Sequence, residues 1–120
     1  MHKRVLLKLS GEVLGDKKGD GIDAGALVWI AREIVRVAKS GIQIAIVIGG
    51  GNIWRFRDNR AVGIERSTSD YMGMLATVMN SVALQSAIEK AGVPCRVLSA
   101  IDLPKLKVEY LPYDWSLNGR

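Results

Sequence analysis

The chain has 120 residues, enough for one domain with a single hydrophobic core. Its 48% hydrophobic and 24% charged residues exclude a collagen-like, low-complexity or disordered chain. One cysteine (Cys95) and one histidine (His2) exclude an intrachain disulfide bond and a zinc site of the usual Cys/His type. The net charge of +5 favours anionic partners and leaves two classes open, phosphorylated small molecules and nucleic acid.

The amino-terminal segment does not predict a signal peptide. Residues 1–8 begin with charged side chains, and Lys8 interrupts the apolar stretch that follows them. The longest apolar run, residues 42–48, is far too short to cross a bilayer. We therefore expect a cytoplasmic protein without a membrane partner.

The first part of the chain predicts a strand, a loop, a helix and a second strand. Residues 4–10 predict a buried strand, and residues 15–21 a polar, glycine-rich loop. Asp23 is typical of a helix N-cap and Gly41 of a helix stop. Residues 42–48 are rich in β-branched side chains, which is typical of a parallel strand covered on both faces. Between the cap and the stop, apolar residues recur at helical spacing: Leu27, Ile30, Ala31, Ile34, Val35 and Ala38.

The second part predicts a long helix over residues 70–91, ended by Gly92, and a third strand over residues 93–99. Alternating strands and helices predict a parallel sheet between helix layers, so the predicted fold class is α/β. Proline residues break the tail after residue 103, and we predict no element there. The inner face of the long helix is expected to consist of Met72, Leu75, Ala76, Met79, Val82, Ala83 and Ala87.

The strongest chemical signal is the run Gly49-Gly50-Gly51, which directly follows the second predicted strand. In parallel sheets, ligands bind beyond the carboxyl ends of the strands, and glycines let the backbone approach them closely. A short helix opening at Asn52 would add free N–H groups, and Arg55 could bind a phosphate with two hydrogen bonds. The alternative interpretation of a lone triple glycine is a tight turn with a surface arginine.

Two further positions have both a structural and a functional interpretation. Lys8 lies at the end of the first predicted strand and is followed by Ser10 and Gly11, so it could contact a phosphate or simply extend to the surface. Asp70 begins the long predicted helix, where it could cap the helix or accept hydrogen bonds from sugar hydroxyls. The sequence contains neither a P-loop motif nor the signature motifs of protein kinases.

Four segments together resemble one enzyme family. They are KLSGE at residues 8–12, GID at 21–23, GGGN at 49–52 with Arg55, and DYMGMLATVMN at 70–80. Over residues 4–103 the chain is similar to the bacterial-type UMP kinases (uridylate kinases) of the amino acid kinase superfamily. The helical segment after Asp70 is the most specific part of this resemblance.

The resemblance implies a three-layer αβα fold with a mainly parallel sheet and Mg²⁺-dependent phosphoryl transfer from ATP to UMP. It also implies a homohexamer built as a trimer of dimers, with GTP as activator and UTP as inhibitor. Family members are roughly twice this length, a size usual for a complete α/β domain. Residues 1–120 are therefore expected to form the phosphate- and UMP-side half of the fold, without the C-terminal nucleotide half.

The resemblance also implies roles for individual residues, with Lys8 and Arg55 as the catalytic pair. Gly50 and Asp70 would bind UMP, and no metal-ligating residue is expected in this part of the chain. The residues that would contact ATP are Lys8, Leu9, Ser10, Gly11, Gly51 and Arg55. The residues of the implied GTP-control loop are Asp16, Lys17, Lys18, Gly19, Asp20 and Gly21.

Three alternatives stay open on the sequence alone. The first is a kinase of the same superfamily with a different acceptor, which the segment 70–80 disfavours. The second is a non-catalytic fragment that binds nucleotide or assembles with other chains. The third is nucleic-acid binding through Arg55, Arg57, Arg60 and Arg66, which interleaved acidic residues and the lack of an RNA-binding signature disfavour.

Overall fold

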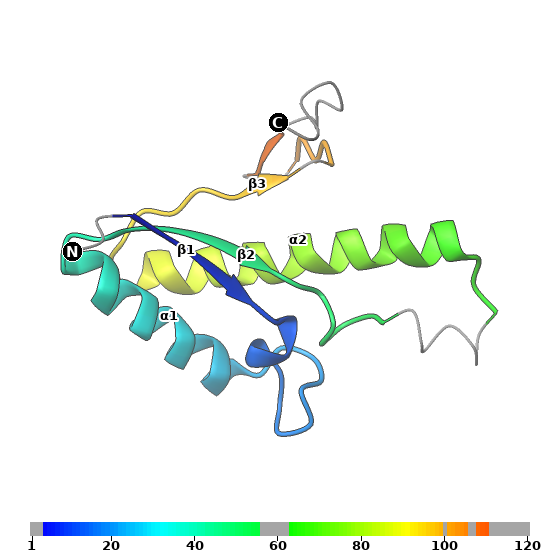
Figure 1. The fold of residues 1–120 in the computed structure, drawn as a ribbon, viewed down its shortest axis with the longest axis horizontal. Helices are drawn as coiled ribbons and strands as arrows, with labels where there is room; N and C mark the ends of the chain where they lie inside the picture. Colours follow the sequence, from blue (N-terminus) through cyan, green and yellow to red (C-terminus); the bar gives the residue numbers. More distant parts are fainter. Residues whose placement is uncertain (1–3, 56–62, 100, 106–107, 111–120) are drawn as a thin grey trace.

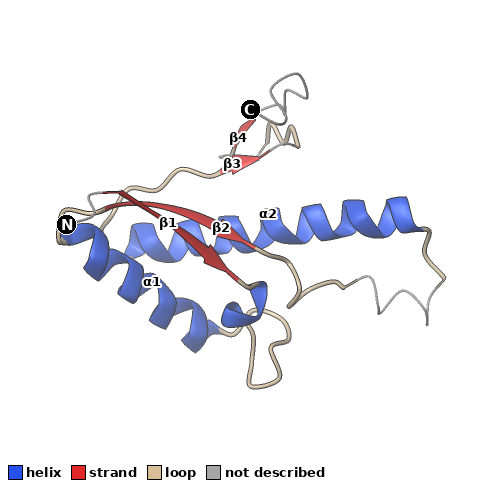
Figure 2. Cartoon of the chain, in the orientation of Figure 1, coloured by secondary structure: helices blue, strands red, loops and turns tan. Residues whose placement is uncertain are grey.

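The fold is built around two parallel strands and two helices. The computed structural model describes residues 4–55, 63–99, 101–105 and 108–110 (Figure 1). Strand β1 (Arg4–Leu9) pairs in parallel with β2 (Gln43–Ile48), in a register that places Arg4 beside Gln43 and Leu9 beside Ile48. A short 3-10 helix, η1 (Gly11–Leu14), follows β1, and helix α1 (Ala24–Lys39) forms the crossover to β2 (Figure 2).

Local signals account for the bounds of α1. The Asp23 carboxylate accepts a hydrogen bond from the backbone N–H of Ala26 at 2.9 Å, so the predicted N-cap is confirmed. Gly41 takes a φ of 98° just after the helix, a conformation that favours glycine over other residues. The first strand, the loop, this helix and the second strand are therefore where the sequence predicts them.

Helix α2 (Arg66–Lys90) begins four residues before the predicted start, because Glu65 and not a residue near Asp70 occupies the N-cap position. The predicted inner face is only partly right. Ala76 is buried as expected, but Leu75 and Met79 are 42% and 55% exposed. The face that packs inward repeats every fourth residue and includes polar side chains: Ser69, Ala76, Asn80, Leu84 and Ile88.

Both helices pack against one face of the β1–β2 pair, where the core lies. Alternate strand residues point into it, while Leu6 on β1 and Val47 on β2 are 64% and 54% exposed on the opposite face. The α/β class with a parallel sheet is confirmed, but β1 is not a buried strand, and within the described residues β2 is not covered on both faces. The buried core consists of Leu14, Ala31, Ile34, Val35, Ile48, Leu84 and Ile88.

The predicted third strand is much shorter than expected. Only β3 (Leu98–Ser99) is extended within residues 93–99, and it pairs in parallel with β4 (Glu109–Tyr110) rather than with β2. Pro94 has no backbone N–H to donate. The Gln85 side-chain amide donates a hydrogen bond to the Cys95 carbonyl at 3.0 Å. As a result a groove of about 450 Å³ separates β2 from residues 95–98.

Within the described residues, no helix combines the length and the apolar character that a membrane span requires.

Candidate functional site

The carboxyl ends of β1 and β2 bring together two of the segments that the sequence singled out. The backbone N–H of Gly49 donates to the Leu9 carbonyl at 3.0 Å, which joins the turn after β2 to the end of β1. Gly11 is buried between them, because a Cβ placed there would lie only 2.6 Å from the Gly49 carbonyl oxygen. The two predicted phosphate-binding turns are therefore neighbours, as expected for adjacent parallel strands.

The glycine turn, residues 49–52, makes a single turn and does not open a helix. The N–H groups of Ile53 and Trp54 both donate to the Gly50 carbonyl, at 2.9 and 3.0 Å. The chain then continues without helical hydrogen bonds as far as Arg55, so the predicted short helix at Asn52 is wrong. What remains for an anion is the backbone of the turn itself, without the dipole of a following helix.

The glycine turn packs against helix α2. A Cβ at Gly50 would lie 2.8 Å from the Cβ of Ala76 and 3.1 Å from the Gly73 carbonyl oxygen, so only glycine fits against the helix. The Trp54 indole N–H donates to the buried Ser69 hydroxyl at 2.8 Å, which joins the chain after the turn to the first part of α2. Helix α2 thus contacts the turn at Gly50 and the segment beyond it at Trp54.

Lys8 and Ser10 occupy different environments at the end of β1. The Lys8 side chain is exposed, opposite Val47 in the strand register, and has no hydrogen-bond or ion-pair partner among the described residues. Its ammonium group is therefore available to a ligand. The Ser10 hydroxyl caps η1 by accepting from the Glu12 N–H at 3.2 Å, so part of its hydrogen-bonding capacity is used within the turn.

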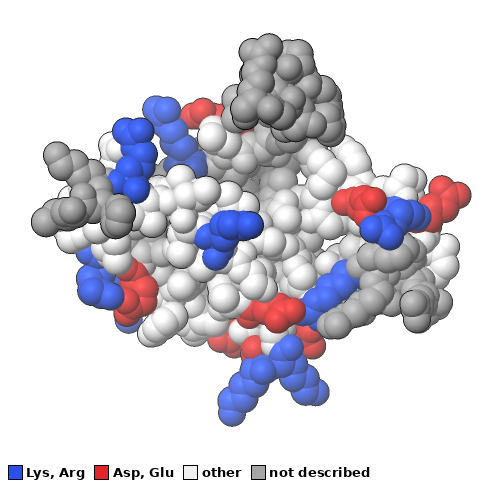
Figure 3. All heavy atoms as spheres, viewed as in Figure 1, with Lys and Arg blue, Asp and Glu red and all other residues white. Residues whose placement is uncertain are grey.

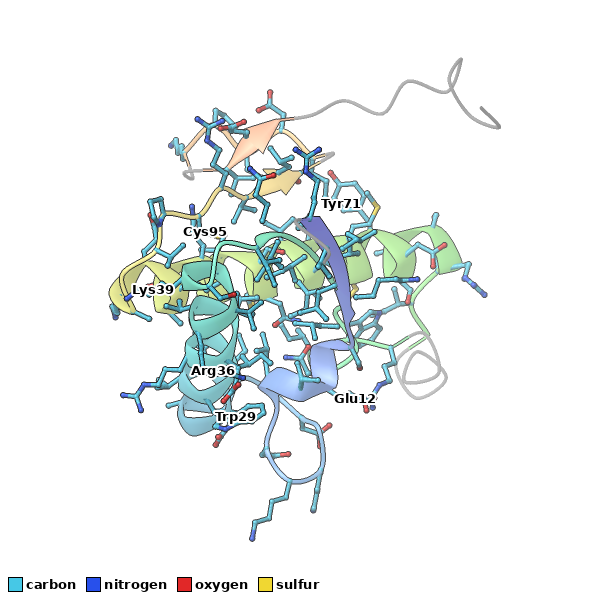
Figure 4. The ribbon with its side chains drawn as sticks, turned by 60° about the vertical axis from the view of Figure 1, so that its left-hand side comes forward. Glu12, Trp29, Arg36, Lys39, Tyr71 and Cys95 are labelled. Atoms are coloured by element: carbon cyan, nitrogen blue, oxygen red, sulfur yellow. The ribbon has the colours of Figure 1, made fainter. Side chains whose placement is uncertain are left out.

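Arg55 is placed beside the glycine turn by an ion pair that the sequence analysis did not foresee. Its guanidinium binds the carboxylate of Glu12, which projects from η1 (Figure 4). A Cβ at Gly51 would lie 3.3 Å from Arg55 Nε, so the side chain runs directly along the turn. Arg55 is half-buried, and a guanidinium has further N–H groups besides the one that binds Glu12.

Asp70 lies within the second turn of α2 and is not its cap. Its carboxylate accepts from Arg66 Nε at 3.2 Å, and both side chains are well exposed. The capping interpretation of Asp70 is therefore wrong, while its possible role as an acceptor for sugar hydroxyls stays a prediction. Asp70 directly follows Ser69, which binds Trp54, so it lies in the part of α2 that meets the chain just after the glycine turn.

The loop over residues 15–21 is ordered by its own hydrogen bonds. The Asp16 carboxylate accepts from the backbone N–H groups of Lys18 and Asp20, at 2.9 and 3.0 Å. Gly19 and Gly21 take positive φ values of 80° and 68°, which explains the glycines at these positions. The Asp16 carboxylate is thus engaged in hydrogen bonds to the loop backbone, while the side chains of Lys17 and Lys18 are exposed.

Two of the four arginine residues of the possible nucleic-acid strip lie within the described residues, and each binds a carboxylate: Arg55 binds Glu12 and Arg66 binds Asp70. Arg57 and Arg60 lie outside the described residues. On the face seen in Figure 3, Lys and Arg side chains are spread over the molecule and interleaved with Asp and Glu.

Cys95 lies at the other end of the sheet from Glu12, together with Lys39 (Figure 4). It is half-buried and packs against the core. Burial raises the pKa of the Cys95 thiol, and the negative charge of Glu89 raises it further. The thiol is therefore a poor nucleophile at neutral pH.

We expect iodoacetamide to alkylate Cys95 in the folded chain at pH 8 several-fold more slowly than in the urea-unfolded chain. A raised pKa leaves less thiolate at a given pH, and the rate should increase until the pH exceeds that pKa. The Glu89→Gln variant removes one of the two causes and should react slightly faster than the wild type. Equal rates for the folded and unfolded chains would contradict the assignment.

Comparison with known proteins agrees with this geometry. The sequence model of the Amino acid kinase family matches residues 3–117. The chain is similar to the UMP kinase from Bacillus anthracis, at 37% identity and a TM-score of 0.82. It is also similar to the UMP kinase from Ureaplasma parvum, at 34% identity and a TM-score of 0.82. In both cases the match covers 92% of this chain and 46% of the solved chain, so this chain spans about half the length of either. The resemblance predicted from the four sequence segments is confirmed, and the chain belongs to the amino acid kinase family.

Proposed function

We propose that this chain is the phosphate- and UMP-side half of a UMP kinase, which transfers a phosphoryl group from ATP to UMP and forms UDP for pyrimidine nucleotide synthesis. The observation that carries the proposal is the meeting of two phosphate-suited turns at adjacent strand ends, beside one exposed lysine and one arginine. The similarity to two bacterial UMP kinases supports UMP as the acceptor. The enzyme class within the family and the acceptor are both parts of this proposal.

Phosphoryl transfer needs little covalent chemistry from the protein, since most of the catalysis comes from alignment and from neutralising charge. In the proposed site the Lys8 ammonium and the Arg55 guanidinium bind phosphate oxygens, and the backbone of the glycine turn lies against the transferred group. Glu12 holds the Arg55 side chain along the turn, which limits the number of orientations that the guanidinium adopts. Asp70 would accept hydrogen bonds from the ribose of UMP.

Magnesium is proposed to enter with ATP. The described residues contain no group of three or more histidine, cysteine or acidic side chains that could hold a metal ion by themselves. This fits Mg²⁺, which usually keeps several waters and is held by substrate phosphates with one or two carboxylates. Glu12 is the carboxylate that lies beside the proposed phosphate site.

Regulation and assembly are also part of the proposal. The loop over residues 16–21 is proposed to respond to GTP, with UTP as an inhibitor of the whole enzyme. Large apolar side chains on the outer side of α2 are exposed, and such a surface suits contact with a second copy in a homo-oligomer. These side chains are Tyr71, Met74, Leu75 and Met79.

Isothermal titration of the folded 120-residue chain with UMP, and separately with Mg-ATP, tests the proposal. We expect UMP to bind and the Asp70→Asn variant to bind it roughly tenfold more weakly, as for the loss of a charged hydrogen-bond acceptor. The matched control is Asp102→Asn, an exposed aspartate on another segment, which should leave UMP binding unchanged. A folded chain that binds neither ligand would overturn the proposal and favour a fragment that only assembles with other chains.

A further inference from the structure

Two asparagine side chains are buried where the glycine turn meets α2. Asn80 is fully buried on the inner face of α2, at 0% exposure, and Asn52 ends the glycine turn at 5% exposure. Buried amides are costly unless their donors and acceptors are paired. Their hydrogen-bond partners therefore show what these two residues do.

The two amides bind each other reciprocally. Asn52 Nδ2 donates to Asn80 Oδ1 at 3.1 Å, and Asn80 Nδ2 donates to Asn52 Oδ1 at 2.7 Å. Each Nδ2 has a second hydrogen, and each of these also has a partner. All four donor hydrogens and both acceptor oxygens of the pair are thus used.

The outer partners are backbone carbonyls from two other segments. Asn80 Nδ2 donates to the Gly49 carbonyl at 2.8 Å, at the start of the glycine turn. Asn52 Nδ2 donates to the Gly21 carbonyl at 2.7 Å, and the Gly21 N–H donates back to the Asn52 carbonyl at 2.8 Å. The pair therefore connects α2, both ends of the glycine turn and the end of the loop over residues 16–21.

The turn that follows β1 packs directly on the same pair. A Cβ at Gly11 would lie 2.5 Å from Asn52 Oδ1, so the backbone at Gly11 sits against the amide with no space between them. All three segments that the sequence predicts to bind substrate, the end of β1, the glycine turn and α2, converge on these two side chains. Neither asparagine was assigned a role from the sequence.

We propose that Asn52 and Asn80 are positioning residues, which fix the glycine turn on α2 and join it to the loop over residues 16–21. The inference rests on the proposed function, because the turn is proposed to lie against the transferred phosphoryl group and to contact UMP through Gly50. A turn held at Gly49 and Asn52 presents its backbone in one geometry before the ligand arrives, and a preorganised site loses less free energy on binding. A displacement of Gly21 would also move Asn52, so the loop and the turn shift together.

The chemistry of the pair points to positioning rather than to general core packing. An apolar side chain at either position would fill the space but would leave the Gly49 or Gly21 carbonyl without its donor. The amides select one arrangement of two backbone segments that apolar contacts would not select. Leu84, the next buried residue along the same face of α2, packs in the core and provides a matched comparison.

The test compares Asn80→Ala with Leu84→Ala in the 120-residue chain, using amide hydrogen exchange by NMR and UMP titration. Exchange of the Gly21 and Ile53 N–H groups is expressed relative to that of the Val35 N–H, which is buried in the interior of α1 and reports overall stability. In Asn80→Ala we expect both ratios to rise roughly tenfold and UMP to bind more weakly by a similar factor. In Leu84→Ala we expect overall destabilisation with unchanged ratios and unchanged UMP binding below its melting temperature.

Each remaining outcome also decides the proposal. Unchanged exchange ratios in Asn80→Ala, or raised ratios with wild-type UMP affinity, would overturn the positioning role. If the wild-type chain binds no UMP, the proposed function fails, and the exchange ratios alone then support or overturn the connection between loop and turn. Should Asn80→Ala not fold, Asn80→Ser keeps one donor toward Gly49 and serves in its place, with a smaller expected rise.

Discussion

The Lys8→Ala variant of a kinase that carries this chain together with a C-terminal half is expected to lose two to three orders of magnitude in turnover, roughly the effect of removing one preorganised charge-stabilising group. Lys8 is exposed at the end of β1, and it has no partner among the described residues that would compete with a phosphate. Arg55, by contrast, is bound to Glu12 and carries less uncompensated charge. The larger share of charge neutralisation is therefore expected from Lys8.

UMP affinity should change much less than turnover in this variant. The developing charge lies on the transferred group, whereas the acceptor is held in the proposal by Gly50 and Asp70. A loss confined to kcat, with a KM for UMP near the wild-type value, is the signature of an interaction made in the transition state. Steady-state kinetics with a coupled ADP assay would measure both constants.

A second exposed lysine controls for a general loss of positive charge. Lys39 lies in the last turn of α1, at the end of the sheet away from Glu12 (Figure 4), so Lys39→Ala should leave both constants unchanged. Wild-type turnover in Lys8→Ala would contradict the catalytic assignment. An equal loss in both variants would mean that overall charge, and not the position of Lys8, is what matters.

The parts of the fold that were predictable from the sequence are those set by neighbouring residues. Asp23 and Gly41 fix the ends of α1 through a cap and a positive φ, and both signals are visible in the sequence. The β-branched, apolar composition of residues 42–48 was an equally local signal for β2. Once two parallel strands are placed side by side, the meeting of the turns after Leu9 and Ile48 follows from topology.

The inner face of α2 was harder to predict because the apolar side chains there do not mark the buried positions. The prediction placed Leu75 and Met79 inside, yet both are exposed, while the polar Ser69 and Asn80 are buried. Ser69 and Asn80 are buried because the glycine turn offers them hydrogen-bond partners. A pattern of apolar residues carries no information about such partners.

The contacts that organise the site lie far apart in the sequence. Arg55 and Glu12 are separated by 43 positions, and Asn52 and Asn80 by 28. Each residue stands inside a segment that the sequence marked as functional, but nothing in the sequence pairs one with the other. The segments were therefore predictable, and the side chains that hold them together were not.

The Gly11→Ala variant should destabilise the chain by about 1–3 kcal/mol, a typical cost of overpacking a buried position. The added Cβ would lie 2.5 Å from Asn52 Oδ1, 2.6 Å from the Gly49 carbonyl oxygen and 3.0 Å from the Gly49 carbonyl carbon. Two of these atoms belong to the backbone of the glycine turn, so relief of the clash requires the turn to move. Urea unfolding followed by circular dichroism would measure the loss of stability.

Gly73→Ala is the matched control, and it should change stability in the opposite direction. Gly73 lies inside α2 with no atom within 4 Å of its added Cβ, so alanine should stabilise the helix by about 0.5–1 kcal/mol. The two variants add the same methyl group, one against the glycine turn and one into open space. If Gly11→Ala were as stable as the wild type, the end of β1 and the glycine turn could not be in the close contact described here. UMP binding by Gly11→Ala should weaken as well, because the turn that moves is the one proposed to bind the phosphate.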